Sequence, residues 1–131
     1  MKTIPQLLQR LDPKSEYDTT VGYGIVSVGK GVPYDVLVEG RFRFFGWTFM
    51  VHRDPNNPEL YAVSEAKTGA NISCYGCATP EKAVREAVNV LWRRRYMLHT
   101  SIMDIVVGRH IDFEAKNRGL SLGIDVMTWN L

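Results

Sequence analysis

Two cysteines, at positions 74 and 77, are the residues whose type and spacing point most directly to chemistry. Cys74-Tyr75-Gly76-Cys77 has the C-x-x-C spacing of redox dithiols and of half a zinc site. The pair lies between a predicted strand and a helix start at Thr79, where a helix N-terminus can stabilise a thiolate. However, the helix starts two residues after Cys77, no βαβ unit precedes the pair, and zinc needs four ligands. We therefore expect a structural or incidental role for both thiols, with thiol redox chemistry or metal binding at Cys74 and Cys77 as the alternative.

Two further segments approach catalytic motifs but each lacks a required residue. Residues 24–31 nearly match the phosphate-binding loop G-x-x-x-x-G-K-[S/T], but Gly31 replaces the hydroxyl that would hold magnesium. His52-Arg53-Asp54 approaches a kinase catalytic loop, but Asn57 follows the aspartate by three residues where the motif needs five. The sequence therefore predicts no catalytic residue, no metal and no cofactor, and we expect a protein that is not an enzyme.

A run of three arginines, Arg93 to Arg95, stands between Trp92 and Tyr96 and suggests a binding surface. At 100° per residue, three consecutive helical side chains point in three directions. Arg95 would share a face with the apolar stripe of the preceding helix, so either this helix ends near residue 94 or Arg95 is partly buried and paired with an acid. We predict the first of these. Basic side chains suit the exposed carbonyls at a helix C-terminus. Arg109 would likewise lie on the apolar stripe of the next helix, and it is a candidate binding contact.

The composition is that of an ordinary globular domain. Of the 131 residues, 45% are apolar and 23% charged, so we expect a single domain over residues 1–131. The net charge of +2 neither implies nor excludes a nucleic-acid partner. No apolar run approaches the ~18 residues of a membrane span, and the N-terminus has no signal-peptide core. We expect a cytoplasmic protein with no membrane contact.

Helix signals are clear in three places. Thr3 and Pro5 suit the start of a helix over residues 3–11, and Thr79-Pro80-Glu81 suits the start of a second. Residues 100–118 are predicted to form one helix or two pieces, with caps at Thr100 or Ser101, a possible break at Gly108 and a stop at Gly119.

The strands are predicted between these helices. Residues 21–28, 36–38, 61–64 and 71–75 have strand character, and residues 122–129 could form a final strand. The aromatic residues over 42–53 predict one long strand whose alternation changes phase, so we expect a bulge or a sharp bend at Gly46. The predicted fold is α+β: an antiparallel meander sheet of four to six strands with two to three helices packed on one face.

The order helix, strand meander, helix is similar to that of a double-stranded-RNA-binding domain. Residues 78–87 stand where that family has its second helix, which the family opens with a lysine cluster that grips phosphate. Here only Lys82 is present, beside Pro80 and Glu81. The similarity therefore implies a fold and no function.

The leading functional expectation is a small interaction domain that binds a protein partner, as a regulator or inhibitor of the kind found in phages and mobile elements. Its candidate contacts are Tyr61, Arg93, Arg94, Tyr96 and Arg109. The first alternative is nucleic-acid binding through Arg41, Arg43 and Arg53, which flank the aromatic run, together with Arg93 and Arg94. That alternative requires these arginines to converge on one face. A homodimer is a further option.

Overall fold

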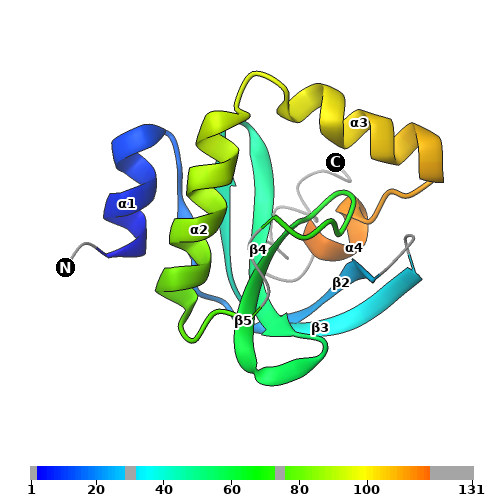
Figure 1. The fold of residues 1–131 in the computed structure, drawn as a ribbon, viewed down its shortest axis with the longest axis horizontal. Helices are drawn as coiled ribbons and strands as arrows, with labels where there is room; N and C mark the ends of the chain where they lie inside the picture. Colours follow the sequence, from blue (N-terminus) through cyan, green and yellow to red (C-terminus); the bar gives the residue numbers. More distant parts are fainter. Residues whose placement is uncertain (1–2, 29–31, 73–75, 119–131) are drawn as a thin grey trace, which may run out of the picture.

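The computed structural model describes residues 3–28, 32–72 and 76–118, which form an antiparallel sheet of five strands with helices packed against it (Figure 1). This confirms the predicted α+β class and the meander. The elements in chain order are α1 (Ile4–Leu11), β1 (Tyr17–Asp18), β2 (Gly22–Val28), β3 (Val32–Phe44), β4 (Trp47–Asp54), β5 (Asn57–Glu65), α2 (Pro80–Arg93), α3 (Leu98–Arg109) and α4 (Glu114–Arg118).

Strand β3 organises the sheet, because it pairs with three other strands. Its first part pairs with β2 and its last part with β1 along one edge, while β4 pairs with the other edge from Val38 onward. The β3–β4 register shifts between Val38 and Gly40, where a bulge bends the strand. We call the part of the sheet before this bend, β2 with residues 32–37 of β3, the wing. The wing folds back toward β5, where the Ser27 backbone N–H donates to the Gly69 carbonyl at 2.9 Å.

The aromatic run over 42–53 forms two strands and not one. The bulge predicted at Gly46 is therefore wrong. The alternative, a sharp bend at Gly46, is confirmed, because the chain reverses its direction there. Phe45 and Gly46 form the two-residue turn between β3 and β4, with φ of 50° and 85°. Positive φ at both positions is the pattern of the tight turn that matches the twist of a hairpin. The reversal pairs Phe42 with Phe49 and Phe44 with Trp47, which places the aromatic residues of both strands on the same face. That is the physical reason for the change of phase.

Other strand predictions had mixed outcomes. The predicted turn after residue 54 is present, and the strand predicted over 61–64 extends to Asn57–Glu65. In the segment 71–75, Asn71 makes one isolated bridge to Ser64, and 73–75 lie outside the described residues. The strand predicted over 122–129 and the stop at Gly119 also lie outside them.

The helix predictions hold for α1 and α2. The Thr3 hydroxyl accepts from the Gln6 backbone, and the Thr79 hydroxyl accepts from the backbone of Lys82 at 3.2 Å. The region 100–118 is indeed two helices, but the first begins at Leu98 without a side-chain cap, so caps at Thr100 or Ser101 are wrong. The break falls at His110, which has φ of 55°, and not at Gly108.

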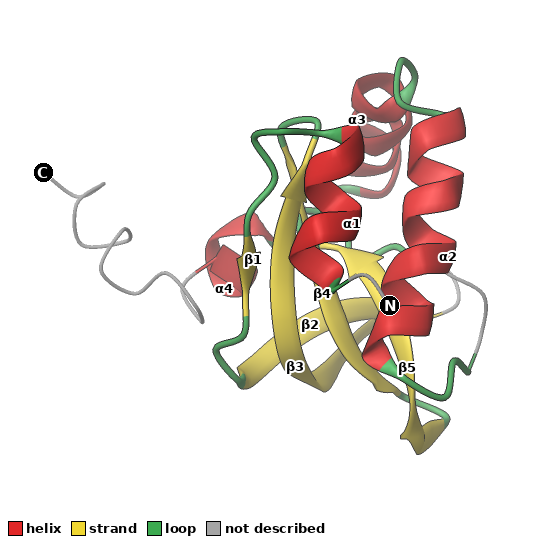
Figure 2. Ribbon diagram, turned by 90° about the vertical axis from the view of Figure 1, so that its left-hand side faces the viewer, coloured by secondary structure: helices red, strands yellow, loops and turns green. Residues whose placement is uncertain are grey.

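Two apolar cores lie on opposite sides of the sheet. Helices α1, α2 and α3 cover one side (Figure 2) and share a core with Phe42, Phe44, Phe49, Val51 and Val63. The wing encloses a smaller core against the other side, made of Val26, Val36, Val38, Met50 and Ala66. Helix α4 packs against β2, on the side opposite α1 and α2. None of the helices in the described ranges is long and apolar enough to cross a membrane.

Asn117 of α4 fastens the wing to the body, so its truncation tests this arrangement. Its side chain is fully buried; Oδ1 accepts from the Ile25 N–H at 2.8 Å, and Nδ2 donates to the carbonyls of Ile25 at 3.1 Å and Ala66 at 2.6 Å. Asn117→Ala leaves three backbone groups without a partner, and we expect it to lower the free energy of unfolding in urea by about 2 to 3 kcal/mol. The exposed Asn89→Ala is the control and should change stability by less than about 0.5 kcal/mol. Equal values for the two variants would show that α4 does not hold the wing.

Candidate interaction site

The turn from α2 into α3 builds a cluster of basic and aromatic side chains at one end of the molecule. Helix α2 ends at Arg93, as predicted, and Arg94 caps it with its backbone N–H on the carbonyl of Val90 at 3.1 Å. The Met97 N–H then bonds to the Arg94 carbonyl at 2.8 Å, which closes the turn before α3. The buried Leu91 and Leu98 anchor both sides of this turn in the core. We call the cluster the α2–α3 corner; it consists of Phe45, Trp92, Arg93, Arg94, Arg95, Tyr96 and Met97.

Arg95 holds the aromatic side chains of the corner together. Its guanidinium lies over the Trp92 ring at 3.9 Å and over the Tyr96 ring at 4.6 Å. Its Nη1 also donates to the Trp92 carbonyl at 2.6 Å. The prediction that the helix ends near residue 94 explains this position, because Arg95 leaves the helix and folds back over its last turn. Stacking of this kind lowers the number of conformations open to a tryptophan, an arginine and a tyrosine at a surface.

Phe45 joins the corner from the β3–β4 turn. Its ring centroid lies 5.9 Å from that of Trp92 and 4.8 Å from that of Phe44. Its backbone N–H donates to the Asp12 carboxylate at 2.7 Å, at the end of α1. No sequence motif singles out Phe45 as a binding residue. The available signal was a glycine between two aromatic runs, which is typical of a hairpin turn that exposes its central residues.

The corner is exposed. Tyr96 retains 87% of its accessible surface, Met97 retains 62% and Phe45 retains 38%. Arg93 and Arg94 are also exposed. Large apolar side chains that stay open to solvent beside arginines have the composition of protein-binding surfaces.

The structure divides the predicted protein-binding residues into three places. Arg93, Arg94 and Tyr96 lie together in the corner. Tyr61 is half-buried on β5, bridged to Cys77 near the start of α2, so the length of that helix, about 20 Å, separates it from the corner. Arg109 is exposed in the last turn of α3.

The predicted nucleic-acid arginines do not share one exposed face. Arg43 is exposed near the β3–β4 turn, with Nη2 3.4 Å from the Gly46 carbonyl. Arg53 is paired with Glu39 at 2.8 Å and stacks on the Tyr61 ring at 4.5 Å. Arg41 is buried. The aromatic residues Phe42, Phe44 and Phe49 are also buried in the core, so they offer no platform for bases.

Among the arginines whose burial the structure describes, only Arg41 is buried. Its side chain is 3% exposed, and Nε, Nη1 and Nη2 have no hydrogen-bond partner there. Burial lowers the pKa of Arg41 below its ordinary value, and the carboxylate of Asp18 on the neighbouring strand opposes that shift. The residue lines a pocket of about 400 Å³ that also contains Glu16 and Asp18. Arg43 also lines this pocket, so its two arginines face two acidic side chains.

The structure describes only one of the two cysteines. Cys74 lies outside the described residues, and the buried Cys77 thiol donates to Glu86 Oε2 at 3.3 Å. Among the described residues, no three histidine, cysteine or acidic side chains are grouped as a metal site would need.

A serine–histidine pair, which the sequence analysis missed, lies on the wing side of the sheet. His52 Nδ1 lies 2.7 Å from the Arg53 carbonyl, which can only accept, so Nδ1 carries the proton. Nε2 then accepts from the Ser64 hydroxyl at 2.7 Å. The β4–β5 register, in which His52 faces Ala62, brings the two side chains together. This is the hydrogen bond of a nucleophile and its base, but both side chains are buried and no substrate can reach Ser64 Oγ.

Comparisons with protein-family models, with curated proteins and with solved structures find no match to this chain.

The buried His52 predicts a loss of stability in mild acid. Burial lowers the pKa of His52 below 6.5, so the folded protein binds this proton less readily than the unfolded chain does. Its contribution to stability is therefore complete above pH 6.5 and is lost as pH falls toward the lowered value, by at most about 1.4 kcal/mol per pH unit. We expect His52→Gln to show a smaller decrease in unfolding free energy than the wild type between about pH 7.5 and about pH 5.

Glu65 contributes in the opposite direction, because burial raises its pKa and the stability that it adds is lost as pH rises. The wild type and His52→Gln both contain Glu65, so the difference between their profiles of unfolding free energy against pH measures the contribution of His52. Identical profiles would show that His52 is not held neutral in the folded state.

Proposed function

We propose that this protein is a non-enzymatic interaction domain that binds an acidic surface of a protein partner through the α2–α3 corner. The observation that carries the proposal is the stack of Trp92, Arg95 and Tyr96 with Tyr96 almost fully exposed. Tryptophan, tyrosine and arginine are the residues that most often dominate the binding energy of protein interfaces. An interaction domain of this kind suits a regulator or an inhibitor.

The charge of the corner supports an acidic partner. Arg93, Arg94 and Arg95 are consecutive, and the residues that define the corner include no acid; the Asp12 carboxylate beside it is bonded to the Phe45 N–H. Arg93 Nε bonds to the Asn89 carbonyl at 3.2 Å, and Arg95 bonds to the Trp92 carbonyl, so neither bond neutralises a charge. Carboxylates on a partner would make charge-assisted hydrogen bonds with these guanidinium groups. They would also speed association at low salt.

The backbone of Phe45 supports a functional role for the β3–β4 turn. A bulky residue at φ of 50° is strained, and glycine, asparagine or aspartate would adopt this conformation at lower cost. Strained positions cluster at functional sites, where the side chain is retained in spite of the backbone. The Phe45 ring contacts the rings of Phe44 and Trp92, and its exposed part contributes to the surface of the corner.

A site-specific photocrosslinker in place of Tyr96 tests the proposal in a lysate of the source organism. We expect a discrete crosslinked protein, and we expect the same crosslinker at Val107, an exposed position of α3, not to capture it. With that partner purified, Arg94→Glu should weaken the affinity by about tenfold or more, because the guanidinium is replaced by a repelling charge. The affinity of the wild type should also fall with increasing salt.

Two results would contradict the proposal. The first is equal capture from positions 96 and 107 with no effect of Arg94→Glu. The second is binding of a short single-stranded oligonucleotide that Arg94→Glu abolishes, since the corner would then serve a nucleic acid.

Two substitutions of Phe45 separate backbone strain from binding. Phe45→Asn and Phe45→Ala both remove the ring, but asparagine tolerates positive φ better than alanine does. In urea unfolding, Phe45→Asn should be more stable than Phe45→Ala by about 0.5 to 1 kcal/mol. Both variants should bind the partner more weakly than the wild type by a similar factor. Equal stability of the two variants would show that no strain is stored in this turn.

A further inference from the structure

Among the described residues, the wing has a strand edge at Asp35 with no partner strand, and the proposed function does not use it. The β2–β3 ladder pairs Ile25 with Asp35 and Ser27 with Pro33. The N–H and carbonyl of Ile25 bond to the Asn117 side chain, and the Ser27 N–H bonds to the Gly69 carbonyl. In both residues of β2, these backbone groups therefore point away from β3. In an antiparallel pair, the residue opposite then directs its own groups away as well. The N–H and carbonyl of Asp35 and the carbonyl of Pro33 therefore point to the other edge of β3.

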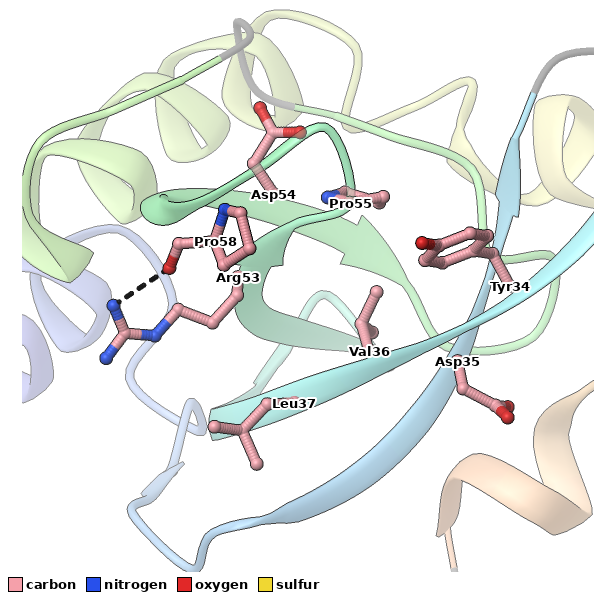
Figure 3. A pocket seen from close by; sticks show the side chains of 8 residues that line it. All are labelled: Tyr34, Asp35, Val36, Leu37, Arg53, Asp54, Pro55 and Pro58. Atoms are coloured by element: carbon pink, nitrogen blue, oxygen red, sulfur yellow. Dashed lines mark hydrogen bonds between the residues drawn. The ribbon is translucent and has the colours of Figure 1, made fainter.

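That edge has no partner strand among the described residues. Strand β4 pairs with β3 only from Val38 onward and leaves it after His52, where the register shifts again between Arg53 and Asp54. The space that β4 vacates is a pocket of about 380 Å³ between β3 and the β4–β5 turn (Figure 3). It is lined by Tyr34, Asp35, Val36 and Leu37 from β3 and by Arg53, Asp54, Pro55 and Pro58 from the end of β4, the turn that follows and the start of β5.

The side chains along this edge alternate in character. Tyr34 and Val36 project toward the pocket, whereas Asp35 and Leu37 project to the opposite side of the strand (Figure 3). Tyr34 is 48% exposed and Val32 is 60% exposed, although both belong to a regular strand. Arg53, at the end of the pocket, is neutralised by Glu39. The edge therefore offers backbone hydrogen bonds, an apolar side and one exposed carboxylate.

We propose that the free edge of β3 at Asp35 is a second binding site, which takes an extended peptide segment of a partner protein as an added antiparallel strand. The peptide continues the path of β4, so it runs in the direction of β4 and bonds to both backbone groups of Asp35. Its residues that face Tyr34, Val36 and Pro55 are apolar. The residue beside the Asp35 carboxylate is lysine or arginine, because opposite charges on neighbouring strands attract.

A second copy of this chain is a poorer occupant of the same edge. Asp35 is the residue of the edge that offers both a donor and an acceptor, so two copies would pair Asp35 with Asp35. That register places two carboxylates directly opposite each other, which destabilises the pair. The edge lies on the wing, away from the α2–α3 corner (Figure 1), so the two sites can be tested separately.

Selection from a displayed library of random linear peptides tests the proposal. We expect the enriched peptides to alternate apolar residues with lysine or arginine. Asp35→Pro removes the N–H donor without touching the β2–β3 ladder, and it should reduce binding of a synthetic selected peptide at least tenfold in fluorescence polarisation. Asp35→Lys keeps the backbone donor and should also reduce binding. A peptide with glutamate in place of its basic residue should then bind Asp35→Lys better than it binds the wild type.

Two further variants serve as controls for the peptide-binding measurement. Glu59→Lys makes the same change of charge at an exposed position of β5 outside the pocket, and Arg94→Glu alters the corner; neither should affect the peptide. Since Asp35→Lys changes an exposed side chain, it tests the site even where the proline variant does not fold. The proposal is overturned by selected peptides that are insensitive to both Asp35 variants, or by a library that yields no enriched peptide. Sedimentation showing a wild-type dimer that Asp35→Lys dissociates would overturn it in favour of self-pairing.

Discussion

The pairing of one strand, β3, on both of its edges is the constraint on which the rest of the structure depends. Its last part lies between β1 and β4, and its first part pairs with β2 alone. The bulge between Val38 and Gly40 turns the strand between these two environments. Gly40 lacks a side chain where one would collide with the Tyr17 ring, so β1 can lie close to β3 at the bend. Without the bend, the wing would extend into solvent and the second core would not form.

Buried polar side chains hold the returning wing in place. Asn117 bonds to β2 and to the residue after β5, and the Ser27 hydroxyl donates to the Thr68 carbonyl at 2.6 Å. The turn at Thr68 is itself held by the buried Glu65, which accepts from the Thr68 N–H and hydroxyl. Gly69, at φ of 71°, lets the β2 backbone approach this turn closely. Each group is satisfied by a specific partner, which is the condition under which polar groups can be buried at low cost.

The fold thus separates two kinds of surface. On the helix side, α2 ends where three arginines and three aromatic residues meet, at the same end as the β3–β4 turn. On the wing, the sheet leaves one short edge without a partner strand among the described residues. The corner recognises side chains through charge and aromatic area, whereas the edge recognises an extended backbone. The two proposals therefore concern partners, or parts of a partner, with different chemistry.

The sequence by itself determined the starts of α1 and α2 and the class of the fold, because these depend on local signals, whereas α3 begins at Leu98 without a side-chain cap to mark it. Thr3 and Thr79 cap helices in any context, and the basic residues at 93–95 marked the end of α2. Only the tertiary structure decided the rest. The prediction of one strand through Phe45-Gly46 was wrong because the alternation of apolar residues does not distinguish a bulge from a hairpin turn. Both bring the aromatic residues on either side of Gly46 to the same face of the sheet. The stack over Arg95, the burial of Arg41 and the open edge at Asp35 depend on which segments lie beside them, and those segments are distant in the chain.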